Sequence, residues 1–305
     1  GLFGPATQRA VKRFQAKYGI SFYSSFHGRT LGALSLHHSK EIHRKGYMLL
    51  PNKSLPFNDS AGEELKNIIK KEGAESIAFI ITEVLQGEGG YKIASRKMIK
   101  ELRKITKEYR IPLICDEVQS GMGRTGKWWA FQNYDIVPEA FSAAKALQVG
   151  AIVSSKNLFP KEVGSISSTW GGGHVLDMAL GSKTIEIIKK EKLLERNKKM
   201  GRYILDRLNT INGISNQRGL GMMLAFDLPS SSIRDDFIIE CVKNGLLVLG
   251  CGERSIRVIP PYVIEKREVD EGLNIIEKAV KTCSLKGFKH RGKICDFMEC
   301  GRSIS

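Results

Sequence analysis

PLICDEVQSGMGRTGKWW, residues 112–129, is the stretch that decides the fold. Three apolar residues run directly into two adjacent acids, Asp116 and Glu117, and then into a loop with three glycines. A short buried strand that ends on carboxylates needs partners for them, because an unpaired buried charge is very costly. No lysine or arginine close in the sequence is placed for Asp116. Its partner must therefore come from elsewhere in the chain or from a ligand.

The residues before this stretch alternate between strand and helix patterns. Residues 76–84, SIAFIITEV, are apolar and β-branched, as in a buried strand. Apolar residues then recur every three or four positions from Met98 to Tyr109, which predicts one face of an amphipathic helix. Residues 113–115 form the next predicted strand. Strand, helix and strand at this spacing predict two parallel strands with a right-handed crossover.

Acidic residues collect where these predicted strands end. They are Glu83, Glu88, Asp116 and Glu117. In open parallel sheets, ligands bind beyond the carboxyl ends of the strands. The sequence therefore predicts a site at this edge of the sheet.

The pattern changes after about residue 190. A long charged helix around residues 187–202 is followed by short apolar segments and two further helices, the last over Lys266–Lys281. The apolar segments read as strands at 221–228, 246–250 and 255–261. Short strands with intervening helices predict a smaller α+β domain.

Composition limits the class of protein. Of 305 residues, 42% are hydrophobic and 26% charged, which is typical of a globular protein, and no apolar run is long enough to span a bilayer. No signal-peptide pattern opens the chain. The six scattered cysteines are typical of reduced thiols in a cytoplasm. The net charge of +16 falls on predicted helices that also carry glutamates, without interleaved aromatic residues, so solvated helix faces are favoured over nucleic-acid binding.

Lys145 is the one charged residue in the small and apolar stretch FSAAKALQVGA, residues 141–151. Apolar surroundings would desolvate the amine, lower its pKa and make it nucleophilic. A lysine whose stem lies on apolar surface while its amine stays in water is the alternative. An aspartate that faces a pyridine nitrogen, with a lysine placed to form an imine, is typical of pyridoxal 5'-phosphate enzymes. The positive partner of Asp116 would then be a protonated pyridinium.

Five motifs in this order resemble the class III aminotransferases, and the match is closest to 4-aminobutyrate aminotransferase-like members. They are SFHGRTLGALSL, ITEVLQGEGG, LICDEVQSGMGRTGKWWAF, SAAKAL and IRVIPP, and the resemblance covers roughly residues 20–281. It implies an α/β fold of the fold type I class, with a mostly parallel sheet, helices on both faces and a small α+β carboxyl-terminal domain. It also implies an enzyme that uses pyridoxal phosphate.

The resemblance also implies which residues bind the cofactor. Lys145 would form the imine and move the substrate proton, Asp116 would pair with the pyridine nitrogen, and Gln119 would lie near the phenolic oxygen. Val118 would pack under the ring.

Three further residues complete the implied cofactor site. Phe26 would stack on the other ring face, with His27 beside it, although Phe26 also fits a plain core position. Thr169 would reach the cofactor phosphate of a neighbouring subunit, which implies a homodimer.

Two arginines are implied to bind substrate carboxylates, because a guanidinium binds a carboxylate bidentately. Arg29 matches the contact to the distal carboxylate, and Arg257 matches the contact to the carboxylate of α-amino and 2-oxo acids. Glu88 would neutralise Arg257 when the substrate has no carboxylate there, and Glu83 would line the same pocket.

The implied reaction moves an amino group from an amino acid such as 4-aminobutyrate to 2-oxoglutarate. An amino-acid racemase on the same scaffold and an inactive, truncated or fused fragment are the alternatives. The predicted partners are small amino and oxo acids, without nucleic acid, membrane or metal; the cysteines and His290 near the carboxyl end match no standard zinc spacing.

Four regions are predicted. They are 1–20, similar to part of a peptidoglycan-binding repeat; 21–191, an incomplete cofactor-binding domain; 192–281, a small domain; and 282–305, a disordered basic tail. The family's phosphate-binding loop lies before the matched region, so weak cofactor binding is the expectation for these 305 residues.

Overall fold

The computed structural model describes residues 17–159, residue 162 and residues 173–286. The chain forms two compact units. Unit 1 comprises Gly1–Gln86, Ala94–Gln119 and Ala130–Thr184, and unit 2 comprises Gly87–Ile93, Ser120–Trp129 and Ile185–Ser305. Two short segments, 87–93 and 120–129, thus group with the carboxyl-terminal unit although the sequence pattern placed them in region 21–191. The amino-terminal boundary at residue 20 falls inside a strand, and residues 1–16 lie outside the described residues.

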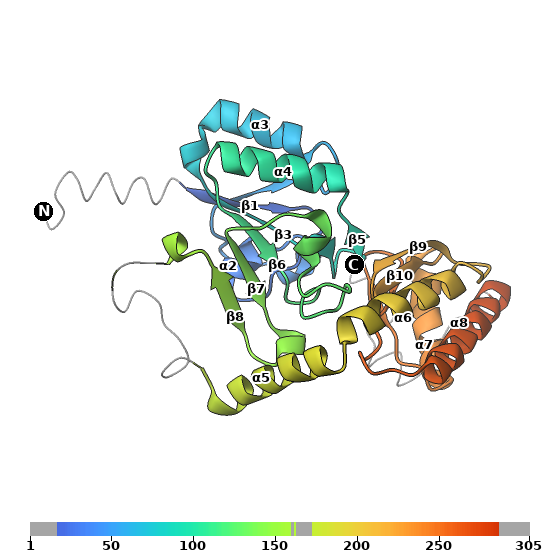
Figure 1. The fold of residues 1–305 in the computed structure, drawn as a ribbon. Coiled ribbons are helices and arrows are strands. Elements are labelled where there is room, and N and C mark those ends of the chain that lie inside the picture. The colour runs from blue at the N-terminus through green and yellow to red at the C-terminus, as the bar shows by residue number, and fades with distance from the viewer. Residues whose placement is uncertain (1–16, 160–161, 163–172, 287–305) are drawn as a thin grey trace, which may run out of the picture. The chain divides into compact units, whose positions relative to one another are not determined.

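A six-stranded sheet forms the centre of unit 1 (Figure 1). In spatial order its strands are β2 (Asn52–Leu55), β1 (Tyr18–Phe22), β3 (Ile77–Thr82), β6 (Leu113–Asp116), β7 (Ala140–Ala143) and β8 (Ala151–Ser154). The first five are parallel, and β8 pairs antiparallel with β7. All five residues of β1 are buried, as expected for an inner strand. The predicted α/β class with a mostly parallel sheet is confirmed.

The predicted βαβ unit consists of β3, α4 (Arg96–Glu108) and β6. Ser95 caps α4, because its side chain accepts a hydrogen bond from the Met98 N–H at 2.9 Å. The buried face of α4 carries Met98, Ile99, Leu102 and Ile105. Tyr109 was expected on this face, but it follows the last helical turn and is 41% exposed. Figure 1 shows α3 (Ala61–Glu72) beside α4.

Shorter elements connect these. They are α2 (Leu31–Ser35), β4 (Leu85–Gln86), β5 (Lys92–Ile93) and the 3₁₀ turns η1 (Glu41–His43), η2 (Ala74–Ser76), η3 (Ala130–Tyr134), η4 (Lys145–Leu147) and η5 (Lys156–Leu158). Helix α5 (Val175–Lys190) runs through the point where unit 1 gives way to unit 2.

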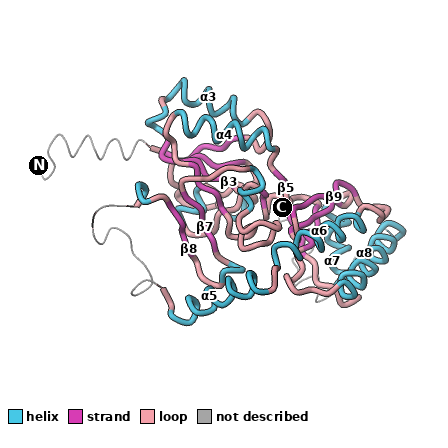
Figure 2. Tube along the Cα trace, viewed as in Figure 1, coloured by secondary structure: helices cyan, strands magenta, loops and turns pink. Residues whose placement is uncertain are grey.

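In the described part of unit 2, a four-stranded antiparallel sheet is accompanied by three helices that lie wholly within the unit (Figure 2). The strands, in spatial order, are β11 (Leu249–Cys251), β12 (Ser255–Val258), β10 (Met223–Asp227) and β9 (Ser215–Leu220), and the helices are α6 (Leu193–Leu208), α7 (Ser231–Lys243) and α8 (Lys266–Lys286). Phe226 of β10 and Phe237 of α7 are fully buried and meet edge to face at 5.7 Å. This core is the small α+β arrangement that the short strands predicted.

Three boundaries in unit 2 differ from the sequence prediction. The long charged helix is interrupted at Lys192, whose left-handed backbone (φ 51°) separates α5 from α6. The strand expected from residue 246 begins at Leu249, and Leu247 is 85% exposed. Helix α8 continues to Lys286 rather than ending at Lys281.

Helix α6 packs tightly against the turn before β10, and glycine makes this possible. A Cβ at Gly201 would lie 1.9 Å from the carbonyl oxygen of Gly221, which is far inside van der Waals contact. Gly221 itself has a left-handed backbone (φ 55°) that glycine adopts without a steric penalty.

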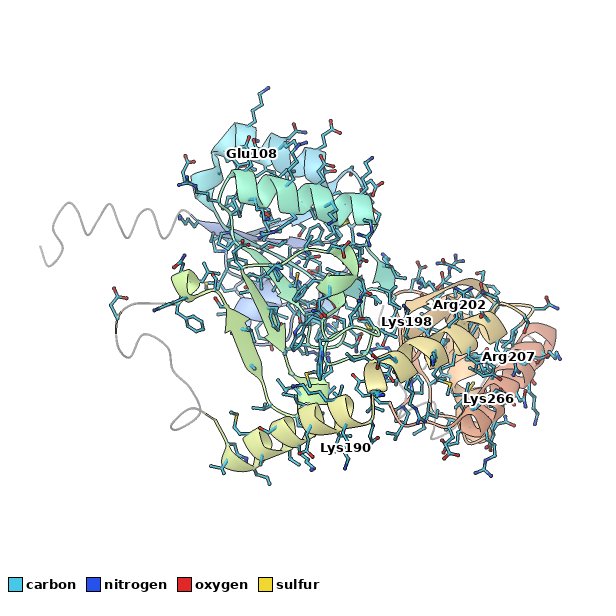
Figure 3. All side chains as sticks on the ribbon, in the orientation of Figure 1. Glu108, Lys190, Lys198, Arg202, Arg207 and Lys266 are labelled. Carbon is cyan, nitrogen blue, oxygen red and sulfur yellow. The ribbon has the colours of Figure 1, made fainter. Side chains whose placement is uncertain are left out.

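Exposed helix surfaces carry part of the excess of positive charge. Figure 3 shows Lys190, Lys198 and Arg202 as side chains on α5 and α6, and all three are exposed. This agrees with the solvated helix faces expected from the sequence. Among the described helices, none combines the length and apolar character that crossing a bilayer requires.

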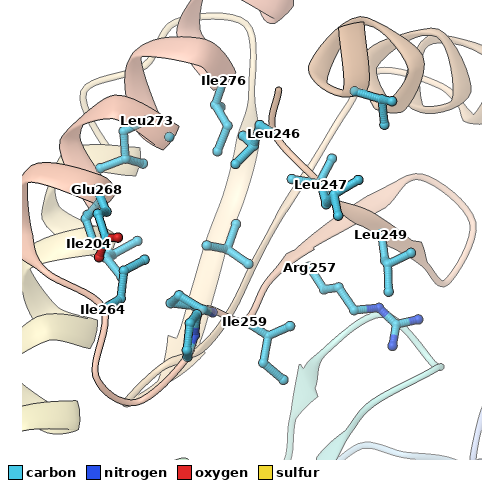
Figure 4. Close-up of a pocket in the computed structure, with 17 residues that line it drawn as sticks. Ile204, Leu246, Leu247, Leu249, Arg257, Ile259, Ile264, Glu268, Leu273 and Ile276 are labelled. Atoms are coloured by element: carbon cyan, nitrogen blue, oxygen red, sulfur yellow. The ribbon is translucent and has the colours of Figure 1, made fainter. Parts of the chain in front are cut away.

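Unit 2 also has an apolar pocket of about 720 Å³ between β11, β12 and α8 (Figure 4). Leu249, Ile259, Leu273 and Ile276 are among its lining residues. Arg257 and Glu268 are the charged side chains in the lining.

Candidate active site

The carboxyl ends of four neighbouring parallel strands bring the predicted cofactor residues of unit 1 to one edge of the sheet. Asp116 is the last residue of β6 and pairs in register with Ser142 of β7. Glu83 follows β3 directly, and Lys145 follows β7 by two residues. Phe26 and His27 come from the loop after β1. This is the edge at which a ligand site was predicted.

Asp116 has three hydrogen-bond partners. His27 Nδ1 lies 2.8 Å from Oδ2, and Oδ1 accepts from the Val118 N–H at 3.1 Å and from the Ser142 hydroxyl at 2.9 Å. Ser142 was not expected from any motif, although its position beside Asp116 follows from the parallel register. The partner that Asp116 requires is therefore supplied partly by the chain itself.

Burial raises the pKa of Asp116, but the hydrogen bonds from His27, Val118 and Ser142 outweigh it, so the net pKa is lowered. The carboxylate is consequently ionised at neutral pH. A carboxylate offers about four lone-pair sites, and three are used here. One site remains for a further positively charged donor.

The second acid, Glu117, has a structural role. Its two carboxylate oxygens accept from the Ala130 N–H at 2.8 Å and the Phe131 N–H at 2.9 Å, at the start of η3. The residue is 1% exposed. Glu117 therefore anchors the end of the glycine loop, whereas Asp116 is the acid available to a ligand.

Glu83 holds the loop that carries Phe26. The Phe26 N–H donates to Glu83 Oε2 at 3.0 Å, and Glu83 is 7% exposed. The Phe26 ring packs on His37 with ring centroids 4.6 Å apart and an interplanar angle of 62°. These contacts fix Phe26 from two directions. Glu83 was predicted only to line the substrate pocket. The structure adds a second role, because Glu83 also supports the loop that carries Phe26.

Lys145 does not have the desolvated surroundings that the sequence suggested, because it is exposed. Lys145 begins the short η4 turn, just after β7. The backbone of Lys145 is left-handed (φ 45°), which is unfavourable for a residue with a Cβ. Such conformations cost roughly 1–3 kcal/mol and cluster at functional sites.

Gln119 and Val118 follow Asp116 in the loop. Val118 contributes its N–H to Asp116, as described. Gln119 Oε1 and His27 Nε2 are buried polar atoms without a hydrogen-bond partner among the described residues. Buried polar atoms are normally paired, so both are available to a ligand. Thr169, the remaining predicted cofactor residue, lies outside the described residues.

Arg29 lies in unit 1 and is exposed. Its Nη2 is 2.9 Å from His43 Nε2. Within the described part of unit 1, no carboxylate pairs with Arg29. The guanidinium therefore keeps donors for an anionic group.

Arg257 and Glu88 form an ion pair in unit 2. Arg257 Nη2 lies 2.8 Å from Glu88 Oε1, and the same guanidinium donates to the Gly250 carbonyl from Nη2 at 2.8 Å and from Nε at 3.2 Å. Arg257 is 8% exposed. Burial lowers the pKa of Arg257. The hydrogen bond to Glu88 and the charge of Glu88 raise it by a larger amount, so the net pKa is raised.

The loop that carries Glu88 is held by residues that no motif indicated. The Gly252 N–H donates to the Glu88 carbonyl at 2.7 Å, and Arg218 Nε donates to the carbonyls of Gly90 and Tyr91 at 3.1 and 3.2 Å. Arg218 is itself paired with Asp227 at 2.9 Å. The contacts of Gly252 and Arg218 to this loop join residues more than a hundred positions apart, which sequence patterns do not reveal.

Comparison with known proteins decides the family. The family model for class-III aminotransferases matches residues 5–280. An acetylornithine aminotransferase of Archaeoglobus fulgidus is 38% identical over 264 residues, which cover 84% of this chain and 67% of that protein. The chain belongs to the class-III aminotransferases. The predicted family and enzyme class are confirmed, and so is pyridoxal phosphate as the cofactor on which this family depends.

Other relatives agree with this class-III aminotransferase assignment. An acetylornithine aminotransferase of Methanosarcina mazei is 34% identical and covers 90% of this chain and 70% of its own length. The structure of a lysine aminotransferase from M. tuberculosis superimposes with a TM-score of 0.82 at 25% identity, over 91% of this chain and 73% of that one. The chain thus spans about two thirds to three quarters of the length of these relatives. None of these three is named for 4-aminobutyrate, the donor that the motifs suggested.

The residues of unit 1 fit pyridoxal phosphate chemically. Asp116 is an ionised carboxylate with one lone-pair site left for a pyridinium N–H. Lys145, on the adjacent strand end, has an exposed amine for the aldehyde carbon. Gln119 Oε1 and His27 Nε2 are buried and unpartnered among the described residues.

Proposed function

We propose that this chain transfers an amino group from a donor with a terminal amine and a distal carboxylate to 2-oxoglutarate. The observation that carries the proposal is the set of three hydrogen bonds that keep Asp116 ionised beside the strand that leads to Lys145. Bound pyridoxal phosphate supplies an electron sink for the electrons left when the substrate loses a proton.

Lys145 would hold the cofactor and then carry the substrate proton, because its side chain is exposed beyond β7. Asp116 would keep the pyridine nitrogen protonated, and His27, Val118 and Ser142 keep Asp116 in place and charged. Phe26, fixed by Glu83 and His37, would pack on the cofactor ring.

Arg29 and Arg257 bind substrate carboxylates. Glu88 already neutralises Arg257 at 2.8 Å, which suits a donor without a carboxylate at that position. A 2-oxo acid would displace Glu88 and take its place on the guanidinium. One arginine can in this way serve two substrates of different charge.

The names of the relatives favour N-acetylornithine as the donor, and 4-aminobutyrate is the alternative because it also has a terminal amine and a distal carboxylate. The test is glutamate formation from 2-oxoglutarate by the cofactor-loaded chain with each donor in turn. We expect turnover with N-acetylornithine to exceed turnover with 4-aminobutyrate. Absence of glutamate with any donor would contradict a transaminase. Loss of optical activity from a single amino acid without an oxo acid would instead indicate a racemase.

Arg257→Ala should separate the two half-reactions. Removing the guanidinium takes away the anchor for the 2-oxoglutarate carboxylate, so the half-reaction that consumes 2-oxoglutarate should slow about 10²-fold or more. The half-reaction with the donor should change far less, because Glu88 occupies Arg257 at that stage. Single-turnover absorbance of each half-reaction measures this. Equal losses in both would contradict the exchange between Glu88 and the oxo acid.

We also propose that two copies associate, with Thr169 of each reaching the other's cofactor phosphate. Support comes from apolar side chains left exposed on β8 and at the start of α5, among them Ile152 at 73%, Val175 at 83% and Leu176 at 61%. A monomeric mass by light scattering would contradict this.

A reducing, cytoplasmic location is supported by the four described cysteines, which are all free and buried.

A further inference from the structure

A hydrogen-bonded chain of three side chains lies in unit 1, and no motif pointed to two of them. Arg29 Nη2 is 2.9 Å from His43 Nε2, and His43 Nδ1 is 2.9 Å from His37 Nε2. Ser39 Oγ lies 2.8 Å from the same His37 nitrogen. The three residues lie in the FHGR loop, just after α2 and at the end of η1.

The position of each proton follows from the arginine. A guanidinium has only donors, so His43 Nε2 must accept. His43 is therefore neutral and carries its proton on Nδ1, which donates to His37 Nε2. The direction of the chain is fixed from Arg29 towards His37.

His37 anchors the inner end of this chain. It is fully buried, and its ring packs on Phe26 at 4.6 Å. Burial is the main reason that the pKa of His37 is lowered to about 4, so the ring is neutral at neutral pH. A neutral, buried acceptor is a fixed point from which His43 can hold the exposed Arg29.

We propose that His43 is a positioning residue that orients Arg29 and thereby sets the preference for donors that carry a carboxylate. This rests on the proposed function, in which Arg29 binds the distal carboxylate. An arginine side chain has about 2 kcal/mol of rotamer entropy, and a guanidinium that is oriented beforehand loses less of it on binding.

Two substitutions separate the two hydrogen bonds of His43. In His43→Gln, the side-chain carbonyl can reach the place of Nε2 and accept from Arg29. In His43→Asn, the shorter amide can keep the contact to His37 but does not reach Arg29. We expect His43→Asn to raise the KM for N-acetylornithine about 5-fold to 10-fold, with kcat unchanged and His43→Gln close to the parent.

A primary amine without a carboxylate serves as the second substrate. Its KM should be the same in the parent and both variants, because Arg29 has no carboxylate to bind. His38→Gln is the matched control, since it removes a similar contact at 3.0 Å, from Arg44 Nη1 to His38 Nδ1. It should leave both KM values unchanged. A KM rise for both substrates in His43→Asn would indicate a general structural defect and overturn the inference.

The tautomer gives a readout that does not need turnover. Nitrogen-detected NMR of the side chains should find the proton of His43 on Nδ1, and Arg29→Ala should allow it to move to Nε2. A proton on Nε2 in the parent chain would overturn the inference. An Arg29→Ala variant with an unchanged KM for N-acetylornithine would contradict the proposed role of Arg29. A raised KM in Arg29→Ala but not in His43→Asn would contradict the role of His43 alone.

Discussion

Lys145→Ala is expected to abolish transamination, with turnover falling by at least about 10⁴-fold. The amine has two roles in the proposed function, since it holds the cofactor and moves the substrate proton, and proton transfer by a positioned side chain alone contributes about 10²–10⁴-fold. Alanine supplies neither group. The measurement is glutamate formation under saturating cofactor, together with the absorbance of the cofactor-loaded protein.

Folding should be almost unaffected by this change, because Lys145 is exposed and its replacement by alanine removes no buried contact from the core. Lys156→Ala is the matched control, as Lys156 is another exposed lysine at the start of a 3₁₀ turn in the same unit. It should retain full activity. Borohydride reduction of the loaded parent chain should leave the cofactor on Lys145, and mass spectrometry that finds it on another lysine would show the assignment to be wrong.

Asp116→Asn is expected to slow turnover roughly 10³-fold or more, equivalent to about 4 kcal/mol in the barrier. The substitution removes the charge that keeps the pyridine nitrogen protonated while almost preserving shape. The local contacts can survive. The Asn oxygen can accept from Val118 and Ser142, and its amide can donate to His27 Nδ1 if the proton on that ring moves to Nε2. The loss should therefore appear in turnover rather than in the thermal midpoint of unfolding.

The adjacent acid provides the matched control. In Glu117→Gln, one of the two backbone N–H groups of η3 would face an amide N–H instead of an oxygen. An unsatisfied buried donor costs about 1–3 kcal/mol, so this variant should lose stability but keep turnover per folded molecule. If Asp116→Asn kept normal turnover, or if Glu117→Gln lost turnover as severely without unfolding, the division of roles between the two acids would be wrong.

The sequence could predict the parts of this protein that depend on near neighbours. The helical repeat after Met98 predicted α4, and the apolar segments on either side predicted β3 and β6 as parallel strands. These predictions succeed because burial of one helix face, or of a whole inner strand, requires apolar residues at a characteristic short spacing in the sequence. The position of acids at the ends of the strands follows directly. The prediction that Tyr109 lies on the buried face was wrong, because α4 ends at Glu108. The ends of helices depend on capping rather than on periodicity.

The functional residues divide in the same way. Short motifs, each a local run of residues, pointed to Asp116, Lys145, Arg257 and the acids at the strand ends. The interruption of the charged helix at Lys192 could not be predicted in this way. Lysine is not a residue type that typically adopts a left-handed backbone, so its presence there did not indicate a break. The exposure of Lys145 was likewise hidden, since neighbours that are apolar in sequence can turn away from a side chain in space.

The tertiary structure brings charged residues together over long stretches of sequence. His27 and Asp116 are 89 positions apart, and Glu88 and Arg257 are 169 apart, yet each pair lies at 2.8 Å. The resemblance implied that Glu88 would neutralise Arg257, whereas only the tertiary structure showed that His27 pairs with Asp116. The chain of Arg29, His43 and His37 was not predicted at all, and neither was the difference between Asp116 and Glu117. Hydrogen bonds are directional and short, so their partners depend on where the backbone places each atom, to within a fraction of an ångström. A pattern of residue types along the chain does not carry that information.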